Sequence, residues 1–168
     1  CEACFDGVVA PIEGAVQWAQ NGHYYLVVNE EVTWSEARSA AEALGGHLAT
    51  IGSAAENLFV KSLAPEIGLA LGGYQPGGPE PAGGWAWVTG EPWTYTAWNS
   101  AEPNDSGGAE DYLQMIGSTG LWNDMGTTSA MPYVVEFPSG FFDDCNGNGL
   151  PDACDVESGT STDCDGDG

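Results

Sequence analysis

The chain has 168 residues, which is enough for one well-buried core and one small appendage. It contains 25 Gly, 11% aromatic residues and only 16% charged residues, a composition that favours a loop-rich globule over a helical bundle or a disordered tail. Two Lys and Arg stand against 25 Asp and Glu, for a formal net charge of −23. Such a chain repels phosphate backbones and anionic lipids, so nucleic acid is excluded as a partner and cations are attracted.

In chain order, the first predicted elements are a strand and a helix. The strand covers Tyr24–Val28, between turn-forming Asn-Gly and Asn-Glu pairs. Thr33 and Glu36 have the spacing of a capping box, and an Ala-rich run continues from there to Leu44. Two glycines follow that run, so the helix is expected to end there.

A second strand and helix are predicted next. The short strand covers His47–Ala49. Ser53 and Glu56 form a second capping-box pattern, which opens a helix to about Leu63 before Pro65 ends it.

The character of the chain changes after Leu69–Leu71. The Gly- and Pro-rich stretch Gly72–Gly84 is predicted to be a surface loop, and late strands are predicted at Leu113–Ile116 and Tyr133–Phe137. Two early helices and later strands with long loops indicate an α+β domain of residues 15–138, preceded by a lead-in segment of residues 1–14. No apolar run approaches membrane-spanning length, so no membrane span is expected.

Several short motifs occur in a characteristic order along this domain. They are WSEA at 34–37, LGGHLATI at 44–51, SAAENLFV at 53–60, WAWVTG at 85–90, YTAWN at 95–99, EPND at 102–105, ED at 110–111, WND at 122–124 and YVVEF at 133–137. In this order the motifs resemble the C-type lectin fold. The resemblance implies two helices, antiparallel strands and a long loop, in a bacterial-type domain that lacks the usual disulfides.

The missing disulfides are a departure from the family pattern. The family usually carries two, and the matching positions here are Ala41 with Val135 and Tyr112 with Thr127. Both members of each pair are absent together, as expected for a fold that persists without the bridges. Each bridge is worth about 2–4 kcal/mol, so core packing must supply that stability.

A group of oxygen-bearing side chains follows the tryptophan-rich region. Its members are Glu102, Asn104, Glu110, Asn123 and Asp124. Carboxylate and carboxamide oxygens are the ligands that Ca²⁺ prefers, and an amide that binds through oxygen keeps its NH₂ group as a donor. A cis peptide before Pro103 would turn both neighbouring side chains toward one ion. The alternative is that these residues are solvated turn formers.

The resemblance implies a more specific role for this set. In the family, two neighbouring sugar hydroxyls coordinate the calcium ion, and the same residues hydrogen-bond the hydroxyls. By this analogy Glu102 and Glu110 accept while Asn104 and Asn123 donate. The Glu-Pro-Asn motif goes with mannose-type sugars, whereas Gln-Pro-Asp goes with galactose. A second calcium site would use Asp105 and Glu80, with Gln75 offered by the same Gly- and Pro-rich loop.

Residues 139–168 form a third segment, rich in Asp, Asn, Gly and Cys. One stretch has the pattern of a twelve-residue EF-hand loop, and a second copy is cut off by the chain end. The predicted ligands are Asp144, Asn146, Asn148, Leu150, Asp152 and Asp155 in the first repeat, and Asp163, Asp165 and Asp167 in the second. The segment resembles dockerin and thrombospondin type 3 repeats, which predicts a calcium-stabilised tail; a flexible acidic linker is the alternative.

The five cysteines lie only near the two ends, at Cys1, Cys4, Cys145, Cys154 and Cys164. Cys145 with Cys154 is the natural local bridge, and Cys164 then lacks a partner nearby. Residues 1–14 fit the end of a preceding calcium repeat. The terminal repeats therefore suggest a longer or self-assembling protein.

No catalytic constellation is present, so the chain is not expected to be an enzyme. The first hypothesis is a secreted or cell-surface module that binds carbohydrate with the help of Ca²⁺. The alternatives are a structural subunit of an extracellular filament or surface layer, and an accessory domain of an enzyme.

Most of the tryptophans are expected in the core, namely Trp85, Trp87, Trp98 and Trp122. Trp93 is compatible with either a core position or a surface that stacks on sugar rings. His23 and His47 are expected to be structural.

Overall fold

The computed structural model describes residues 12–139. Ten elements follow one another in this part of the chain. They are β1 (Val16–Gln17), β2 (Tyr24–Thr33), α1 (Trp34–Ala43), β3 (His47–Leu48), α2 (Ala54–Leu63), β4 (Leu69–Tyr74), β5 (Ala86–Trp87), β6 (Tyr112–Met115), β7 (Trp122–Met125) and β8 (Ala130–Phe137). This confirms the α+β class, and none of the described helices is long and apolar enough to cross a membrane.

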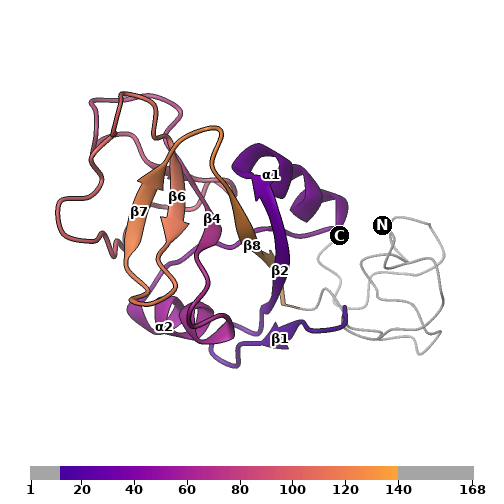
Figure 1. Ribbon diagram of the computed structural model, residues 1–168. Helices are drawn as coiled ribbons and strands as arrows, with labels where there is room; N and C mark the ends of the chain where they lie inside the picture. The colour runs from indigo at the N-terminus through magenta and orange to yellow at the C-terminus, as the bar shows by residue number, and fades with distance from the viewer. Residues whose placement is uncertain (1–11, 140–168) are drawn as a thin grey trace, which may run out of the picture.

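The strands form one sheet that is antiparallel except at a single pair. Its central order is β1-β2-β8-β4-β6-β7, with β3 paired to β8 and β5 paired to β4. The first and last long strands, β2 and β8, lie side by side in the middle of the molecule (Figure 1). The parallel pair joins β4 to β8 through Ala70 and Tyr133. These two strands are far apart in sequence. Parallel pairing requires such a long connection, because a short hairpin can join only antiparallel strands.

Both helices begin at the predicted caps. Thr33 is the N-cap of α1, and the carboxylate of Glu36 accepts hydrogen bonds from the Thr33 backbone N–H at 2.9 Å and from its hydroxyl at 2.6 Å. Ser53 is the N-cap of α2, and its hydroxyl accepts from the N–H of Glu56. Glu56 departs from the capping-box prediction, because its carboxylate accepts from the N–H of Gly52 rather than from that of Ser53.

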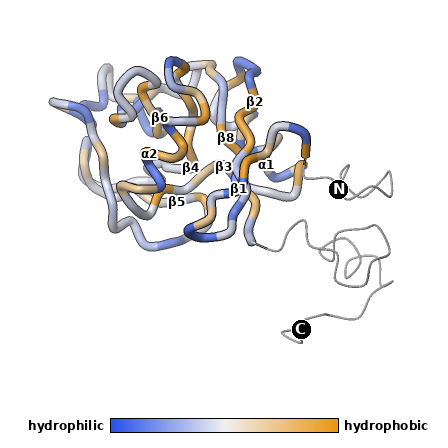
Figure 2. Tube along the Cα trace, turned by 90° about the horizontal axis from the view of Figure 1, so that it is seen from below, coloured by the Kyte–Doolittle hydropathy of each residue, from blue (hydrophilic) through white to orange (hydrophobic). Residues whose placement is uncertain are grey.

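The apolar side chains divide into two clusters. One contains the tryptophan-rich region together with Ile51, Val60 and Leu71, and the other packs α1 onto β8 through Trp34, Ala41 and other residues. The apolar central strands and the more polar peripheral loops are visible along the chain trace (Figure 2). A sheet buried on both sides explains why β4 and β8 are almost wholly buried.

The prediction of a surface loop from Gly72 onward is wrong for its first three residues. Gly72 and Gly73 belong to β4 and are buried. A Cβ on Gly72 would lie 2.5 Å from the Leu48 carbonyl oxygen, and one on Gly73 would lie 2.7 Å from the Leu113 side chain. Glycine is needed here because neighbouring groups approach the strand closely, and this use of glycine resembles a loop signal in the sequence.

Other strands also differ from the sequence prediction: the short β1 and β5 were not predicted, and β8 begins at Ala130. β2 continues to Thr33, past the turn signal at Asn29, because a register irregularity between Val28 and Val32 absorbs the change in pairing. β7 was not predicted as a strand, although it pairs with β6 in regular antiparallel register from Tyr112↔Met125 to Met115↔Trp122.

Three of the four positions that match the family's disulfides are packed against other side chains, whereas Thr127 is exposed. Ala41 and Val135 are both fully buried in the cluster that joins α1 to β8. The Tyr112 ring stacks on Trp34 with 4.5 Å between ring centroids. Close packing therefore surrounds Ala41, Val135 and Tyr112; compensation for the missing bridges remains a prediction.

Candidate functional site

The predicted ligands come together where the long connection between β4 and β6 meets the end of the β6–β7 hairpin. Residues 75–111 extend over that end of the sheet (Figure 1). Asn123 and Asp124 lie on β7, opposite Gln114 and Leu113 of β6. The peptide bond between Glu102 and Pro103 is cis, as the sequence reasoning anticipated.

Asp124 fixes the loop to the sheet. Its side chain is fully buried, and its carboxylate accepts from the N–H of Asn104 at 3.0 and 3.1 Å and from the N–H of Asp105 at 2.7 Å. Charge-assisted bonds of this kind hold a backbone firmly. Asp124 therefore holds Asn104 next to β7.

The remaining ligand candidates surround the same loop. Glu102 accepts a hydrogen bond from the amide of Asn104. Glu110 accepts from the N–H of Ser106 at 2.8 Å, and its own N–H donates to Asp105 at 3.0 Å. The amide nitrogen of Asn123 donates to the carbonyl oxygen of Asp124.

The site is strongly anionic. Burial raises the pKa of Glu102, and the hydrogen bond and charge of Asp124 raise it further, as does the charge of Glu110, while the Asn104 hydrogen bond lowers it. The carboxylate of Glu102 therefore lies close enough to those of Asp124 and Glu110 to be repelled by both. We call these three, with Asn104 and Asn123, the loop cluster.

No cationic side chain neutralises the loop cluster. The sequence contains only two Lys and Arg. Arg38 on α1 pairs with Glu42 at 2.8 Å, and Lys61 on α2 lies beside Gly120, before β7 begins. Both described ion pairs of histidine, those of His23 and His47, are with Glu136. The loop cluster therefore has no cationic side-chain partner in the described part of the chain.

The donor set fits calcium better than a transition metal. Within residues 12–139, no three His, Cys, Asp or Glu side chains are grouped so that they could hold a metal ion by themselves. A calcium ion here would need the amide oxygens of Asn104 and Asn123 in addition to the carboxylates. Ca²⁺ takes 6–8 oxygen ligands of both kinds in flexible geometry.

The residues predicted for a second calcium site are less closely associated. Among the hydrogen bonds of residues 12–139, none joins Glu80 to Asp105, and Asp105 instead braces the loop through Glu110. Gln75 is 5% exposed, and its Oε1 is the one buried side-chain polar atom of the described residues that has no hydrogen-bond partner. Its backbone N–H donates to the carbonyl oxygen of Asp111 at 2.8 Å.

The tryptophans form a packed group rather than a surface platform. Trp85, Trp87 and Trp122 are buried as predicted, and Trp98 is half-buried against them. Trp93, which the sequence left open, is also half-buried and lies 4.3 Å from Trp87 between ring centroids. The aromatic group therefore supports the sheet beneath the long loop.

Sequence reasoning did not identify Gln114, which contacts the site. Its Oε1 lies 3.4 Å from the amide nitrogen of Asn123, across the β6–β7 pair. Predicting β7 as a strand would have revealed this neighbour, because directly opposed residues share one face of a sheet.

The predicted repeats near the chain ends lie outside the described residues. This applies to all five cysteines and to the tail ligands Asp144, Asn146, Asn148, Leu150, Asp152, Asp155, Asp163, Asp165 and Asp167. The expected disulfides and tail calcium sites therefore remain predictions.

Comparison with known proteins bears on the fold and the site together. The model of the lectin C-type domain family matches residues 30–137. The chain is 34% identical over 108 residues to mouse C-type lectin domain family 4 member G, and 31% identical over 115 residues to collectin-10 of Xenopus tropicalis. These matches cover 64% and 68% of this chain but only 36% and 42% of the relatives' length.

Solved structures show the same fold. The carbohydrate-recognition domain of cow CD23, determined in the presence of a GlcNAc2Man3 oligosaccharide, has a TM-score of 0.67 and 28% identity, covering 77% of this chain and 96% of that one. A calcium-independent type II antifreeze protein has a TM-score of 0.67 at 24% identity, covering 77% and 95%. The second likeness shows the fold alone. The relatives form a carbohydrate-binding family rather than a family of enzymes, and the chain described here belongs to the C-type lectin domain family.

Proposed function

We propose that this domain is a calcium-dependent carbohydrate-binding module that recognises mannose-type sugars, in a secreted or cell-surface protein. The observation that carries the proposal is the loop cluster, in which the Glu102 carboxylate is close to those of Asp124 and Glu110 and accepts from the Asn104 amide, with no cationic side chain to balance the charge. Asn123 stands next to Asp124 on β7. A divalent cation satisfies both the charge and the oxygen donors.

Each residue would have a defined role once the cation is bound. Calcium would supply a Lewis-acidic centre that coordinates sugar hydroxyls. Glu102 and Glu110 would accept hydrogen bonds from those hydroxyls, and the amides of Asn104 and Asn123 would donate to them. Asp124 would serve as a ligand while keeping the backbone of Asn104 and Asp105 in place.

Two features support a sugar as the ligand. Glu102 and Asn104 flank the cis-proline in the order that the family resemblance associates with mannose-type sugars. In addition, the CD23 domain of similar fold was determined in the presence of a mannose-containing oligosaccharide. Asp105, Glu80 and the buried Oε1 of Gln75 would contribute to a second calcium ion, for which the unpartnered Gln75 oxygen is the support.

The sugar preference is tested by exchanging the motif. The paired substitutions Glu102→Gln and Asn104→Asp keep side-chain sizes while exchanging one carboxylate and one amide. Competition binding with mannose and galactose should show a reversed preference in this variant, with calcium still required. An unchanged mannose preference in the variant would contradict the assignment. Glu91→Gln, an exposed change outside the loop cluster, is the matched control.

A further inference from the structure

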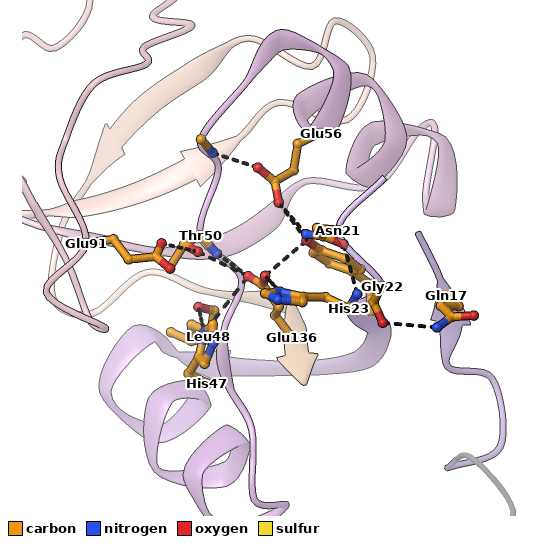
Figure 3. A network of polar contacts seen from close by, with 12 residues as sticks. Gln17, Asn21, Gly22, His23, His47, Leu48, Thr50, Glu56, Glu91 and Glu136 are labelled. Atoms are coloured by element: carbon orange, nitrogen blue, oxygen red, sulfur yellow. Dashed lines mark hydrogen bonds and ion pairs between the residues drawn. The ribbon is translucent and has the colours of Figure 1, made fainter. Parts of the chain in front are cut away.

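A second group of carboxylates lies in the interior, away from the loop cluster. Glu56 of α2 and Glu136 of β8 are 7% and 2% exposed and belong to one network of polar contacts (Figure 3). The hydroxyl of Tyr25 from β2 is within hydrogen-bonding distance of both. We call these three residues the Tyr25 bridge. It connects the first long strand, the last strand and a helix, so the protonation of its side chains affects how stably these three elements pack together.

The number of protons in the bridge does not match the number of acceptors. The Tyr25 oxygen lies 2.6 Å from Glu56 Oε1 and 3.0 Å from Glu136 Oε1. It also accepts from the Asn21 amide at 2.9 Å. A phenol has one proton to donate. If both carboxyl groups were ionised, one carboxylate oxygen would face the phenol oxygen with no proton between them.

Glu136 has other donors that satisfy its charge. His23 Nδ1 lies 2.7 Å from its Oε1, and the N–H of Thr50 donates to its Oε2 at 2.8 Å. The Thr50 hydroxyl lies between Glu136 at 3.2 Å and Glu91 at 3.0 Å, and His47 Nδ1 is 4.0 Å from Glu136. Glu136 is therefore the carboxyl group better suited to remain ionised.

Glu56 has no comparable support. Apart from Tyr25, it accepts from the N–H of Gly52 at 2.7 Å and from the Asn21 amide at 3.3 Å. None of these donors is cationic. A buried carboxyl group without a cationic partner favours its neutral form.

We propose that Glu56 is a neutral carboxylic acid that donates its proton to Tyr25, that Tyr25 donates to Glu136, and that this chain is a pH-sensitive clasp joining β2, α2 and β8. Burial is the main cause that raises the pKa of Glu56; the hydrogen bonds with Tyr25 and Gly52 lower it, the charges of Glu136 and Glu91 raise it, and the net shift is upward. Burial, followed by the charge of Glu136, also raises the pKa of Tyr25, so the phenol keeps its proton. The clasp is closed in acid and loosens in alkali.

The sign of the pH dependence follows from the direction of the shift. The pKa of Glu56 in the folded protein lies above its ordinary value of 4.5. Its contribution to stability is therefore fully present below that ordinary value and is lost as the pH rises through the folded value. His23, His47 and Glu91 are ionisable groups packed around the same centre, so variants must separate their effects from that of Glu56.

The test measures stability against pH in the full chain, at constant calcium. The denaturation midpoint of the wild type should decrease as the pH rises above the ordinary glutamate pKa of 4.5. Glu56→Gln, whose amide imitates the neutral acid, should remove most of that fall. His23→Gln, and Glu66→Gln on the exposed turn after α2, should keep it. A Glu56→Gln chain that keeps the full wild-type slope, or does not fold, would overturn the proposal.

A second measurement does not depend on a variant folding. Carbon-13 NMR of side-chain carboxyl groups in the wild-type protein should show one glutamic acid that keeps its proton to a higher pH than the other glutamates. The Glu56→Gln variant should lack this resonance. A titration in which all glutamates lose their protons over the same pH range would contradict the clasp.

Discussion

The loop cluster and the Tyr25 bridge are both groups of carboxylates, but they are satisfied in different ways. In the bridge, Glu136 has a histidine, a backbone N–H and two hydroxyls within hydrogen-bonding distance. In the loop cluster, the donors are mostly backbone N–H groups of the loop itself, and Glu102 faces two other carboxylates. The protein completes the first group internally and leaves the second short of positive charge.

This difference separates a structural use of acidic residues from a binding use. A buried carboxylate that is fully hydrogen-bonded holds elements together, and its requirements are met within the fold. Several carboxylates without a counter-charge repel one another, and a bound cation relieves this repulsion. The same residue type therefore serves stability in one place and ligand binding in the other.

The largest effect is expected from Asp124→Ala. The change removes a proposed ligand and leaves the N–H groups of Asn104 and Asp105 without their acceptor. Calcium affinity should fall about 100-fold or more, and the unfolding free energy should fall by about 2–4 kcal/mol. Calorimetric calcium titration and chemical denaturation measure the two effects. Glu66→Ala is the exposed control, and equal calcium affinity in both variants would show that Asp124 is not a ligand.

The structural role of the Tyr25 bridge is tested by Glu136→Ala. This change leaves the Thr50 N–H, His23 and Tyr25 without a shared acceptor, so the unfolding free energy should fall by about 2–4 kcal/mol. Because no described hydrogen bond joins Glu136 to the loop cluster, calcium affinity should change by no more than about twofold. A large loss of calcium binding in a folded variant would break the distinction between the two groups.

A smaller effect is expected at Asn57, which ties α2 to the hairpin that carries the site. Its amide donates to the Gly120 carbonyl at 2.9 Å, and its oxygen accepts from the Trp122 ring nitrogen at 2.7 Å. Asn57→Leu should lower the unfolding free energy by about 1–3 kcal/mol, because both partners lose their hydrogen bonds. Denaturation should show this loss. A change of less than about 0.5 kcal/mol would contradict a role for these bonds.

Mild acidification should produce the smallest effect, and it should weaken the loop cluster while leaving the Tyr25 bridge intact. Calcium ligands must be deprotonated, so calcium affinity should fall as the pH is lowered through the raised pKa of Glu102. The Tyr25 bridge should instead be retained, because its proton is already in place. Calcium titrations and denaturation curves over the same pH range would reveal the contrast. Parallel loss of both properties would show that the two groups are not independent.

The helices were largely predictable because their signals are local. Thr33 and Ser53 mark their caps, and the observed helices differ from the predicted ranges by about one residue. The strand β7 was not predictable in the same way, since Trp122–Met125 is short and is stabilised by pairing with β6. Gly72 was wrongly predicted to begin a loop, because glycine is common both in flexible loops and where neighbouring groups approach a strand closely.

The ligand set was predicted through motif spacing, and the structure brings its members onto one loop and one strand. The Tyr25 bridge was not predicted, because Tyr25, Glu56 and Glu136 are separated by up to 111 residues in sequence. Nothing in the local sequence distinguishes Glu136 from a surface glutamate. Only the pairing of β2 with β8 brings it beside Tyr25.

The most direct test is a calorimetric titration of the full chain with mannose, in excess calcium and again in EDTA. The wild type should bind mannose only with calcium. The double variant Glu102→Ala with Asn123→Ala should lose mannose binding while keeping its fold and any calcium bound at other sites. Mannose binding that persists in EDTA, or in a folded double variant, would contradict the account.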